Sequence, residues 1–212
     1  MSVRARIFAA TYDRFSAGSE QACFAAHRQK LLAEASGRVL EIGAGTGANL
    51  RHYGKGVTGL TAAEPEQAMV RKLERRVREN GRTVEVVRAP AEELPFDDAT
   101  FDVAVSTLVL CSVDDQARSL AEIRRVLKPD GRLLFMEHVR SDEPGLARWQ
   151  DRMNRINRLL VCCNCNRPTL DAIQEAGFSI TTLTRGEIPK APPFVRPLIV
   201  GSASQNGGPQ AS

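Results

Sequence analysis

Aromatic residues, cysteines and long apolar runs are all scarce in this 212-residue sequence. Only 5% of the residues are aromatic, and the 29 basic residues, against 25 acidic ones, are mostly scattered. Nucleic-acid-binding proteins usually carry a dense basic stripe or interleaved aromatic side chains. The densest basic group, at 71–78, has helical spacing and is mixed with glutamate, which indicates a solvated helix face. We therefore expect no nucleic-acid partner.

Membrane-spanning and secretory signals are also absent from the sequence. No apolar run approaches the ~20 residues that a helix needs to span a bilayer. The N-terminal stretch MSVRARIFAATYDRF lacks the long apolar core of a signal peptide. The expectation is a cytoplasmic protein without an integral membrane segment, and its oligomeric state is left open.

The five cysteines are an odd number, which argues against a disulfide framework in a chain without a signal peptide. Three of them are crowded into CCNC at 162–165. A structural zinc site usually has two Cys or His pairs separated by a loop, and no second pair follows here. We therefore expect reduced thiols that line a pocket or fill the core, and no metal site.

Short apolar strands alternate with amphipathic helices along the chain. Strands are predicted at 38–42, 56–63, 84–88, 101–107, 132–139, 179–184 and 198–203. After two helices within 3–35, helices are predicted at 48–53, 66–80, 115–127, 149–160 and 168–176. This alternation is typical of an α/β, Rossmann-like fold, with a seven-stranded, mostly parallel sheet and helices on both faces. No linker or repeat divides the chain, so we expect a single domain over 1–204 and a disordered tail over 205–212.

The stretch VLEIGAGTGA at 39–48 is typical of a buried strand that enters a glycine-rich turn. Its G-x-G-x-x-A spacing fits the dinucleotide fingerprint, and E-x-G-x-G-x-G fits the loop of methyl-donor enzymes. A pyrophosphate favours a neutral or basic approach, whereas Glu41 suits the cationic amino-acid end of S-adenosylmethionine. Glu64, about twenty residues further on, can accept from the ribose hydroxyls of either ligand. Nucleoside binding is predicted, and a small dehydrogenase stays open as an alternative.

The ordered set of motifs resembles the class I S-adenosylmethionine-dependent methyltransferases. It comprises EIGAGTG at 41–47, Glu64, AEELPF at 91–96, FDVAVS at 101–106 and LAEIRRVLKPDGRLLFMEHV at 120–139. Three further stretches resemble the branch related to the mammalian alkyl-thiol methyltransferases: TLVLCSV at 107–113, CNRPTLDAIQEAGF at 165–178 and VRPLIVGSA at 195–203. Those relatives carry an N-terminal membrane anchor, and residues 1–30 contain none, so a soluble version is expected.

The resemblance implies methyl transfer from S-adenosylmethionine to a small-molecule acceptor, with a thiol favoured. Related bacterial chains that methylate quinones or phospholipids share similar blocks. An O-, N- or C-methyltransferase acting on a quinone, lipid or secondary metabolite is therefore the alternative. A module that binds the cofactor without turnover is a further one, because fold and motifs guarantee binding more than catalysis.

The resemblance also implies a set of cofactor-binding residues. These are Glu41, Gly43, Ala44, Gly45, Thr46, Gly47, Asn49, Glu64, Pro65, Ala91, Glu92, Thr107 and Leu108. Pro90 stands where many family members have an acid that binds the adenine amino group, and proline offers neither a carboxylate nor an N–H. Adenine is therefore expected to meet the backbone of Ala91 and the side chain of Glu92.

Candidate catalytic and acceptor-site residues lie at strand ends and in the N-terminal segment. His138 follows the fifth strand and is a candidate base or acceptor-orienting group, with a histidine bonded within a loop as the alternative. Cys111 follows the fourth strand and is expected to line the acceptor pocket. By resemblance, 1–35 form a helical cap over the cofactor, in which Tyr12 is a candidate catalytic residue and Asp13 a pocket residue.

Four large apolar residues recur at helical spacing after the fifth strand: Trp149, Met153, Ile156 and Leu159. Ordinary core packing is the expected role of this stripe. A lid over an apolar acceptor is the alternative, and Trp149 is assigned to the substrate pocket on that basis.

Overall fold

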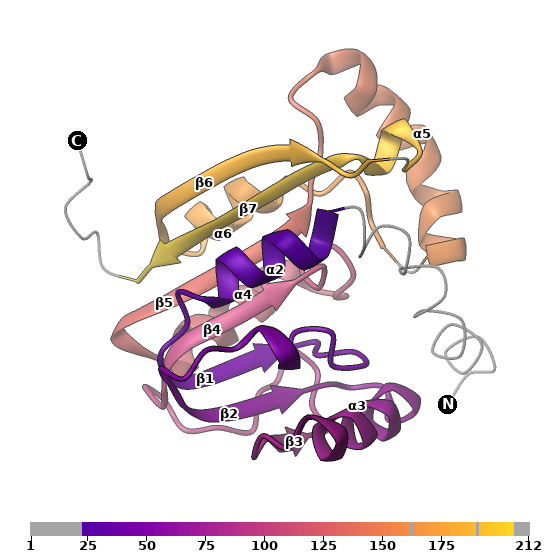
Figure 1. Cartoon of the computed structure of the whole chain (residues 1–212). Helices are drawn as coiled ribbons and strands as arrows, with labels where there is room; N and C mark the ends of the chain where they lie inside the picture. Colours follow the sequence, from indigo (N-terminus) through magenta and orange to yellow (C-terminus); the bar gives the residue numbers. More distant parts are fainter. Residues whose placement is uncertain (1–22, 162, 190, 206–212) are drawn as a thin grey trace.

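A computed structural model describes residues 23–161, 163–189 and 191–205, and in it the strands form one seven-stranded sheet (Figure 1). The strands are β1 (Gly37–Ile42), β2 (Val57–Ala63), β3 (Glu85–Val87), β4 (Phe101–Thr107), β5 (Leu127–His138), β6 (Ser179–Glu187) and β7 (Pro197–Ser204). Their order is β3-β2-β1-β4-β5-β7-β6. The pairs from β3 to β5 are parallel, and β7 runs antiparallel to both β5 and β6. The predicted α/β, mostly parallel sheet is confirmed.

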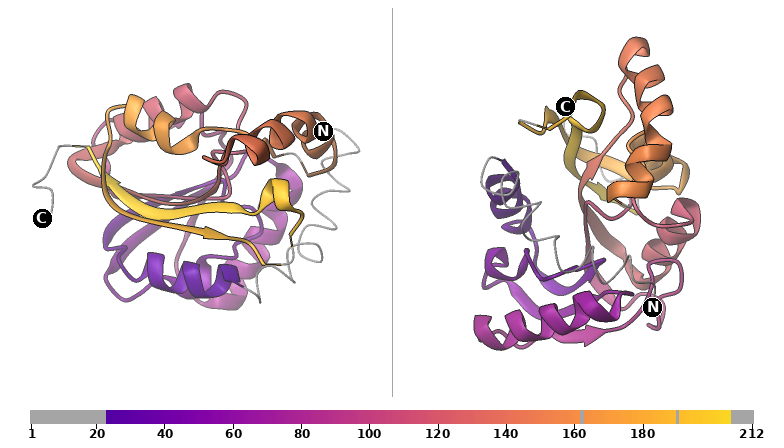
Figure 2. Two further views of the ribbon diagram at one scale, coloured as in Figure 1. Left: turned by 90° about the horizontal axis from the view of Figure 1, so that it is seen from above. Right: turned by 90° about the vertical axis from the view of Figure 1, so that its right-hand side faces the viewer.

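Helices cover both faces of the sheet (Figure 2). They are α2 (Ala25–Leu32), α3 (Gln67–Asn80), α4 (Gln116–Val126), α5 (Pro144–Val161) and α6 (Thr169–Glu175), with 3-10 turns η2 (Leu50–His52) and η3 (Pro193–Val195). Neighbouring residues of a strand point to opposite faces. Leu133 and Phe135 of β5 thus join the core under α4 and α6, whereas Leu134 and Met136 join the core under α2 and α3.

The helix predicted at 48–53 is wrong, because only the short turn η2 forms there. Gly47 has a φ of 85°, which is outside helical geometry, and Tyr53 is already extended. The residues between them make the short-range hydrogen bonds of a 3-10 turn, in which each N–H donates to the carbonyl three residues earlier. One example is the His52 N–H, which donates to the Asn49 carbonyl oxygen at 2.9 Å. This short turn leaves the side chains of Asn49 and Tyr53 free to point back under β1.

Two other predicted boundaries also differ from the structure. The stop signal at 129–131 lies inside β5, where the pairing shifts from Phe101 with Leu127 to Val103 with Arg132, so the intervening residues bulge out of the ladder. Helix α5 begins at Pro144, earlier than the predicted residue 149. Proline is favoured in the first turn of a helix because the missing N–H would have had no partner there.

The strand order reverses between β1 and β4, and the carboxyl ends of both strands point to the same edge of the sheet (Figure 1). Ligands of open α/β sheets bind at such an edge. Gly43 lets the chain turn tightly there, because it has a φ of 55° and a Cβ would lie 2.6 Å from both methyl groups of Val109. The sheet therefore gathers the glycine loop, the end of β2 and the loops after β4 and β5 in one place.

Candidate cofactor and acceptor site

Glu64 is fixed between the glycine loop and the end of β2. Its Oε2 accepts the Gly45 N–H at 2.8 Å and its Oε1 accepts the Glu66 N–H at 2.9 Å. Burial raises the pKa of Glu64, while these two N–H groups act to lower it. Because each carboxylate oxygen has a second lone pair, Glu64 can still accept hydroxyl groups of a ligand. A Cβ on Gly45 would meet no atom nearer than 3.9 Å, so the backbone is open to close approach there.

Glu41 sits in a buried polar network under the glycine loop. Its carboxylate accepts the Asn49 amide at 3.0 Å and the Tyr53 hydroxyl at 2.8 Å. Arg28 donates to the Asn49 carbonyl oxygen at 2.6 Å and to the Thr107 hydroxyl at 2.9 Å, and Asn49 donates to the same hydroxyl at 3.0 Å. The network therefore ties α2, β1, η2 and the end of β4 together, and burial raises the pKa of Glu41 to about 7.

Sequence reasoning missed Arg28 and Tyr53, although it identified their partners. Arg28 lies four residues from both Phe24 and Leu32, and all three are buried. An arginine on the apolar face of a helix was the signal that could have found it, because such a residue needs a buried polar partner. Tyr53 carried no comparable signal, since its role depends on the short turn η2 taking the place of a helix.

The structure also places the other residues expected to bind the cofactor. Thr46 is buried, and Arg76 of α3 donates to its carbonyl oxygen at 2.9 Å and to its hydroxyl at 2.7 Å. Leu108 follows β4 with a φ of 63°, a conformation that is rare for a bulky side chain and common near functional sites. The Glu92 Oε1 accepts the N–H groups of Asp114 and Asp115, at 2.8 and 3.2 Å. This carboxylate therefore holds the loop before α4, while the expected adenine contact of Glu92 stays a prediction.

Glu137 of β5 is fully buried and was not identified from the sequence. Its Oε1 accepts the Ser106 hydroxyl at 2.6 Å and the N–H groups of Val109 and Leu110 at 3.0 and 3.2 Å, and its Oε2 accepts the Cys111 N–H at 3.3 Å. These bonds fix the turn that follows β4. An acid inside the apolar strand LLFMEHV was the available signal.

His138, at the end of β5, lies beside two cysteines. Its Nδ1 is 3.7 Å from the Cys163 Sγ, and the Cys163 side chain also interacts with that of Cys111. The Cys111 thiol and, after it, His138 lower the pKa of Cys163, despite its burial. The bond to Cys163 and burial raise the pKa of Cys111. Burial lowers the pKa of His138, but Cys163 outweighs this effect and raises it. The two residues expected at the acceptor end are thus brought together, with Cys163 between them.

Four of the five cysteines lie within the described residues. Cys23, Cys111, Cys163 and Cys165 form no disulfide with one another. No group of three or more His, Cys, Asp or Glu is arranged to hold a metal ion in the described part of the chain. Cys162 lies outside the described residues, as do Tyr12 and Asp13.

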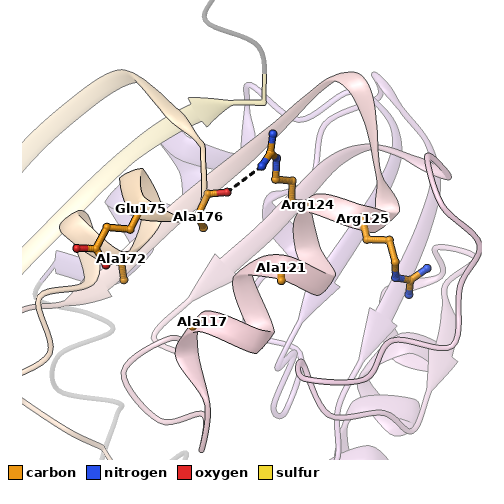
Figure 3. A pocket seen from close by; sticks show the side chains of 7 residues that line it. All are labelled: Ala117, Ala121, Arg124, Arg125, Ala172, Glu175 and Ala176. Carbon is orange, nitrogen blue, oxygen red and sulfur yellow. Dashed lines mark hydrogen bonds between the residues drawn. The ribbon is translucent and has the colours of Figure 1, made fainter.

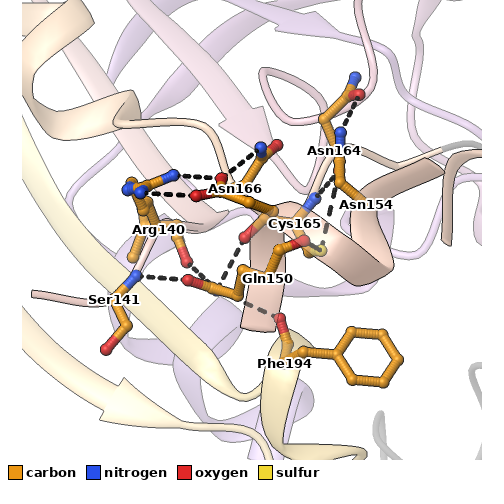
Figure 4. A network of polar contacts seen from close by, with 10 residues as sticks. Arg140, Ser141, Gln150, Asn154, Asn164, Cys165, Asn166 and Phe194 are labelled. Atoms are coloured by element: carbon orange, nitrogen blue, oxygen red, sulfur yellow. Dashed lines mark hydrogen bonds and ion pairs between the residues drawn. The ribbon is translucent and has the colours of Figure 1, made fainter. Parts of the chain in front are cut away.

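Helix α5 is held to the acceptor end through its inner, polar face (Figure 4). The fully buried Gln150 donates to the carbonyl oxygens of Val139, Cys165 and Phe194 at 3.0, 2.8 and 3.1 Å, and it accepts the Ser141 N–H at 2.7 Å. Asn154, on the same helix, accepts the Cys165 N–H at 2.9 Å. These bonds fix α5 against the end of β5 and the 163–166 segment.

The expectation that the apolar stripe of α5 packs in the core is wrong. Trp149, Ile156 and Leu159 are 42%, 50% and 61% exposed, because Gln150 and Asn157 occupy the buried face of the helix in their place. Trp149 makes an edge-to-face contact with Phe194, with the ring centroids 5.6 Å apart. The stripe is thus an apolar surface on a helix that is anchored beside the acceptor end.

A hollow of about 440 Å³ lies on another part of the molecule, between α4 and α6 (Figure 3). It is lined by Ala117, Ala121, Arg124, Arg125, Ala172, Glu175 and Ala176. None of these belongs to the cofactor or acceptor residues described above, and the Arg124 guanidinium is engaged with the Ala176 carbonyl oxygen at 3.3 Å. The hollow is therefore separate from the edge of the sheet where the strand order reverses.

The described residues include no helix that is both long enough and apolar enough to cross a bilayer.

The raised pKa of Glu41 predicts a pH-dependent contribution to stability. Below pH 4.5 the carboxyl group is protonated in both the folded and the unfolded chain, whereas above pH 7 the folded state must bury its charge. Relative to Glu41→Gln, the wild type should therefore lose up to about 3 kcal/mol of unfolding free energy as the pH rises from 4.5 to 8. Urea denaturation at several pH values measures this difference. Glu79→Gln, on the exposed face of α3, controls for the lost charge, and a wild-type advantage that grows with pH would contradict the prediction.

Comparison with known proteins agrees with this geometry. The family model described as a methyltransferase domain matches residues 40–135. The thiol S-methyltransferase TMT1A of Homo sapiens is 37% identical over 171 residues, which cover 78% of this chain and 69% of the relative. Demethylmenaquinone methyltransferase of Clavibacter sepedonicus is 33% identical over 144 residues, which cover 66% of this chain and 58% of the relative.

Solved structures show the same fold. The YcgJ protein of Bacillus subtilis aligns with a TM-score of 0.71 at 20% identity, covering 86% of this chain and all of that chain. The match to a methyltransferase domain and the similarity to TMT1A leave no role for the dehydrogenase alternative. The chain belongs to the class I S-adenosylmethionine-dependent methyltransferases, as its ordered motifs predicted.

Proposed function

We propose that this methyltransferase methylates the sulfur atom of a small, apolar thiol. The observation that carries the proposal is that few of the titratable side chains at the ends of β4 and β5 are available to act as a general base. Glu137 is assigned a positioning role, because it is fully buried and its carboxylate holds the Ser106 hydroxyl and three backbone N–H groups. Among the described groups at this end, His138 is the imidazole that can accept or orient a proton. A thiol, with a pKa near 8.5, ionises partly at neutral pH and needs less help than a hydroxyl or a carbon acid.

The cofactor fits the edge of the sheet on structural grounds. Glu64 is pre-positioned by two N–H groups to accept from ribose hydroxyls, and the open face of Gly45 allows a ligand to approach the backbone. The Glu41 network places a carboxyl group under the loop, where the cationic end of the cofactor is expected. S-Adenosylmethionine brings a methyl group that is already activated on a sulfonium. The chain's main task is therefore to position the two reactants in line.

The apolar character of the acceptor is inferred from α5. Its exposed stripe of Trp149, Ile156 and Leu159 lies on a helix that Gln150 fixes against the end of β5. Exposed apolar side chains gathered on one face favour a ligand or partner of the same character. The printed name of TMT1A, a thiol S-methyltransferase, supports sulfur as the acceptor atom.

Carbon methylation of a quinone is the second candidate. It is favoured by the similarity to a demethylmenaquinone methyltransferase, which is weaker in identity and in coverage than the similarity to TMT1A. An apolar stripe on α5 would suit a quinone as well as a thiol, so the acceptor atom has to be distinguished by kinetics.

The role of Glu64 is tested by calorimetry with S-adenosylmethionine and S-adenosylhomocysteine. Glu64→Ala should weaken the binding of both by about 1–3 kcal/mol, because it removes a charged acceptor of hydrogen bonds. Glu66→Ala is the matched control, because it removes an exposed carboxylate but keeps the backbone N–H that donates to Glu64. Equal affinities of Glu64→Ala and the wild type would refute the ribose contact, and binding of NAD in place of both nucleosides would refute the cofactor assignment.

The acceptor is tested with a series of small alkyl thiols of different pKa and with the corresponding alcohols. Thiols should be methylated, alcohols should not, and the rate should rise with pH as each thiol ionises. His138→Asn should then lower kcat by less than the roughly 10²-fold expected for loss of an essential base, because the thiolate forms without it. Turnover of a quinone or an alcohol without turnover of any thiol, together with a larger loss in His138→Asn, would favour the second candidate.

A further inference from the structure

Cys111 and Cys163 lie together at the acceptor end, where a pair of thiols can also undergo thiol–disulfide exchange. We propose that they form a dithiol site that exchanges with small disulfides, in which Cys163 attacks the disulfide and Cys111 resolves the product. The proposal concerns the chain's own cysteines and needs neither cofactor nor acceptor. Its test is therefore independent of the proposed thiol methylation.

The backbone holds the two cysteines side by side, although they are far apart in the sequence. The Asn164 N–H donates to the Cys111 carbonyl oxygen at 2.8 Å, and the Asn164 side-chain amide donates to the same oxygen at 3.3 Å. On the other side, Asn157 of α5 donates to the Cys163 carbonyl oxygen at 2.7 Å. A disulfide needs Cα atoms about 4.4–6.8 Å apart and side chains that face each other. The two bonds to the Cys111 carbonyl oxygen set the Cys163–Asn164 segment directly against Cys111, and the Cys111 and Cys163 side chains interact there.

The surroundings give the two thiols different roles. Three groups favour a thiolate at Cys163: the Cys111 thiol, the His138 ring at 3.7 Å and the positive charge of Arg167. Arg167 is held in place by donating to the Leu110 carbonyl oxygen at 2.7 Å. The interaction with Cys163, burial and the negative charge of Glu137 all raise the pKa of Cys111, which favours its protonated form. A thiolate is the attacking species in disulfide exchange, so Cys163 is the nucleophile of the pair.

The exchange balances in two steps. The Cys163 thiolate attacks one sulfur of a disulfide R–S–S–R, forms a mixed disulfide and releases R–S⁻, which takes a proton from the His138 imidazolium. Cys111 then loses its proton to the second leaving sulfur as it attacks the Cys163 sulfur, and a second R–SH departs. The small disulfide is reduced by two electrons to two thiols, and the two cysteines are oxidised to a disulfide. The oxidant is the small disulfide itself.

Cys165 supplies a matched control on the same segment. It is fully buried, and its sulfur faces the Gln150 carbonyl oxygen at 3.8 Å and the Asn154 side chain at 3.7 Å. Burial raises the pKa of Cys165 to about 11. A thiol held in the protonated form reacts slowly, so Cys165 should stay reduced while Cys163 reacts.

The test uses the reduced full-length chain, kept free of oxygen and treated with 2-hydroxyethyl disulfide near pH 6.5. The reaction is quenched with acid, the remaining thiols are alkylated and the peptides are mapped by mass spectrometry. In the wild type and in Cys165→Ser, a bond between Cys111 and Cys163 should form. Cys111→Ser should stop at a mixed disulfide on Cys163, and Cys163→Ser should leave Cys111 reduced.

A second measurement keeps the proposal falsifiable if a cysteine variant fails to fold. In the wild type at pH 6, iodoacetamide should alkylate Cys163 at least about tenfold faster than Cys165, because only a thiolate reacts. His138→Asn should slow Cys163 alone. The proposal is overturned if Cys111 stays fully alkylatable in the treated wild type, if the new bond joins Cys162 or Cys165, or if Cys163 and Cys165 are alkylated at the same rate.

Discussion

The hydrogen bonds of the buried Glu41 carboxylate are the contacts on which the rest of the site depends. They connect β1 to the turn η2 through Asn49 and Tyr53, and Asn49 carries the connection to Thr107 at the end of β4. Arg28 adds α2 to the same network, so this helix is fixed over the strand ends. A buried carboxyl group without these donors would be costly, and with them it ties the strand that enters the glycine loop to the turn that follows the loop.

Two further acids repeat this arrangement at other strand ends. Glu64 follows β2 and holds the glycine loop through Gly45, whereas Glu137 ends β5 and holds the turn after β4 through three backbone N–H groups. All three acids are buried, and burial raises the pKa of each. Two of the acids thus organise the glycine loop and the edge proposed for the nucleoside. The third positions the turn that carries Cys111 at the acceptor end.

The fold and most of the cofactor edge could be predicted from the sequence, because strand periodicity and the glycine spacing are local signals. Glu41 and Glu64 were expected from the residues themselves, and Asn49 and Thr107 from the resemblance to the methyltransferases; the structure brings all four to one edge. The acceptor end was harder to predict, because it depends on segments that meet only in the fold. Cys163 lies beside His138 because α5 holds the segment after it in place, and Gln150 makes the bonds that hold α5. The spacing of apolar residues along the chain gave no sign that this polar residue, and not its apolar neighbours, faces the interior. The exposed stripe of Trp149, Ile156 and Leu159 was assigned to the core for the same reason.

We infer that the strand ends of β1, β2 and β4 form a cradle for an amino-acid nucleoside without a phosphate. A crystal structure of the chain with S-adenosylhomocysteine tests this inference most directly. We expect ribose hydroxyls at the Glu64 carboxylate, the amino-acid end beside the glycine loop and the sulfur facing the turn at Cys111. Density for the nucleoside elsewhere, such as in the hollow between α4 and α6, would contradict it.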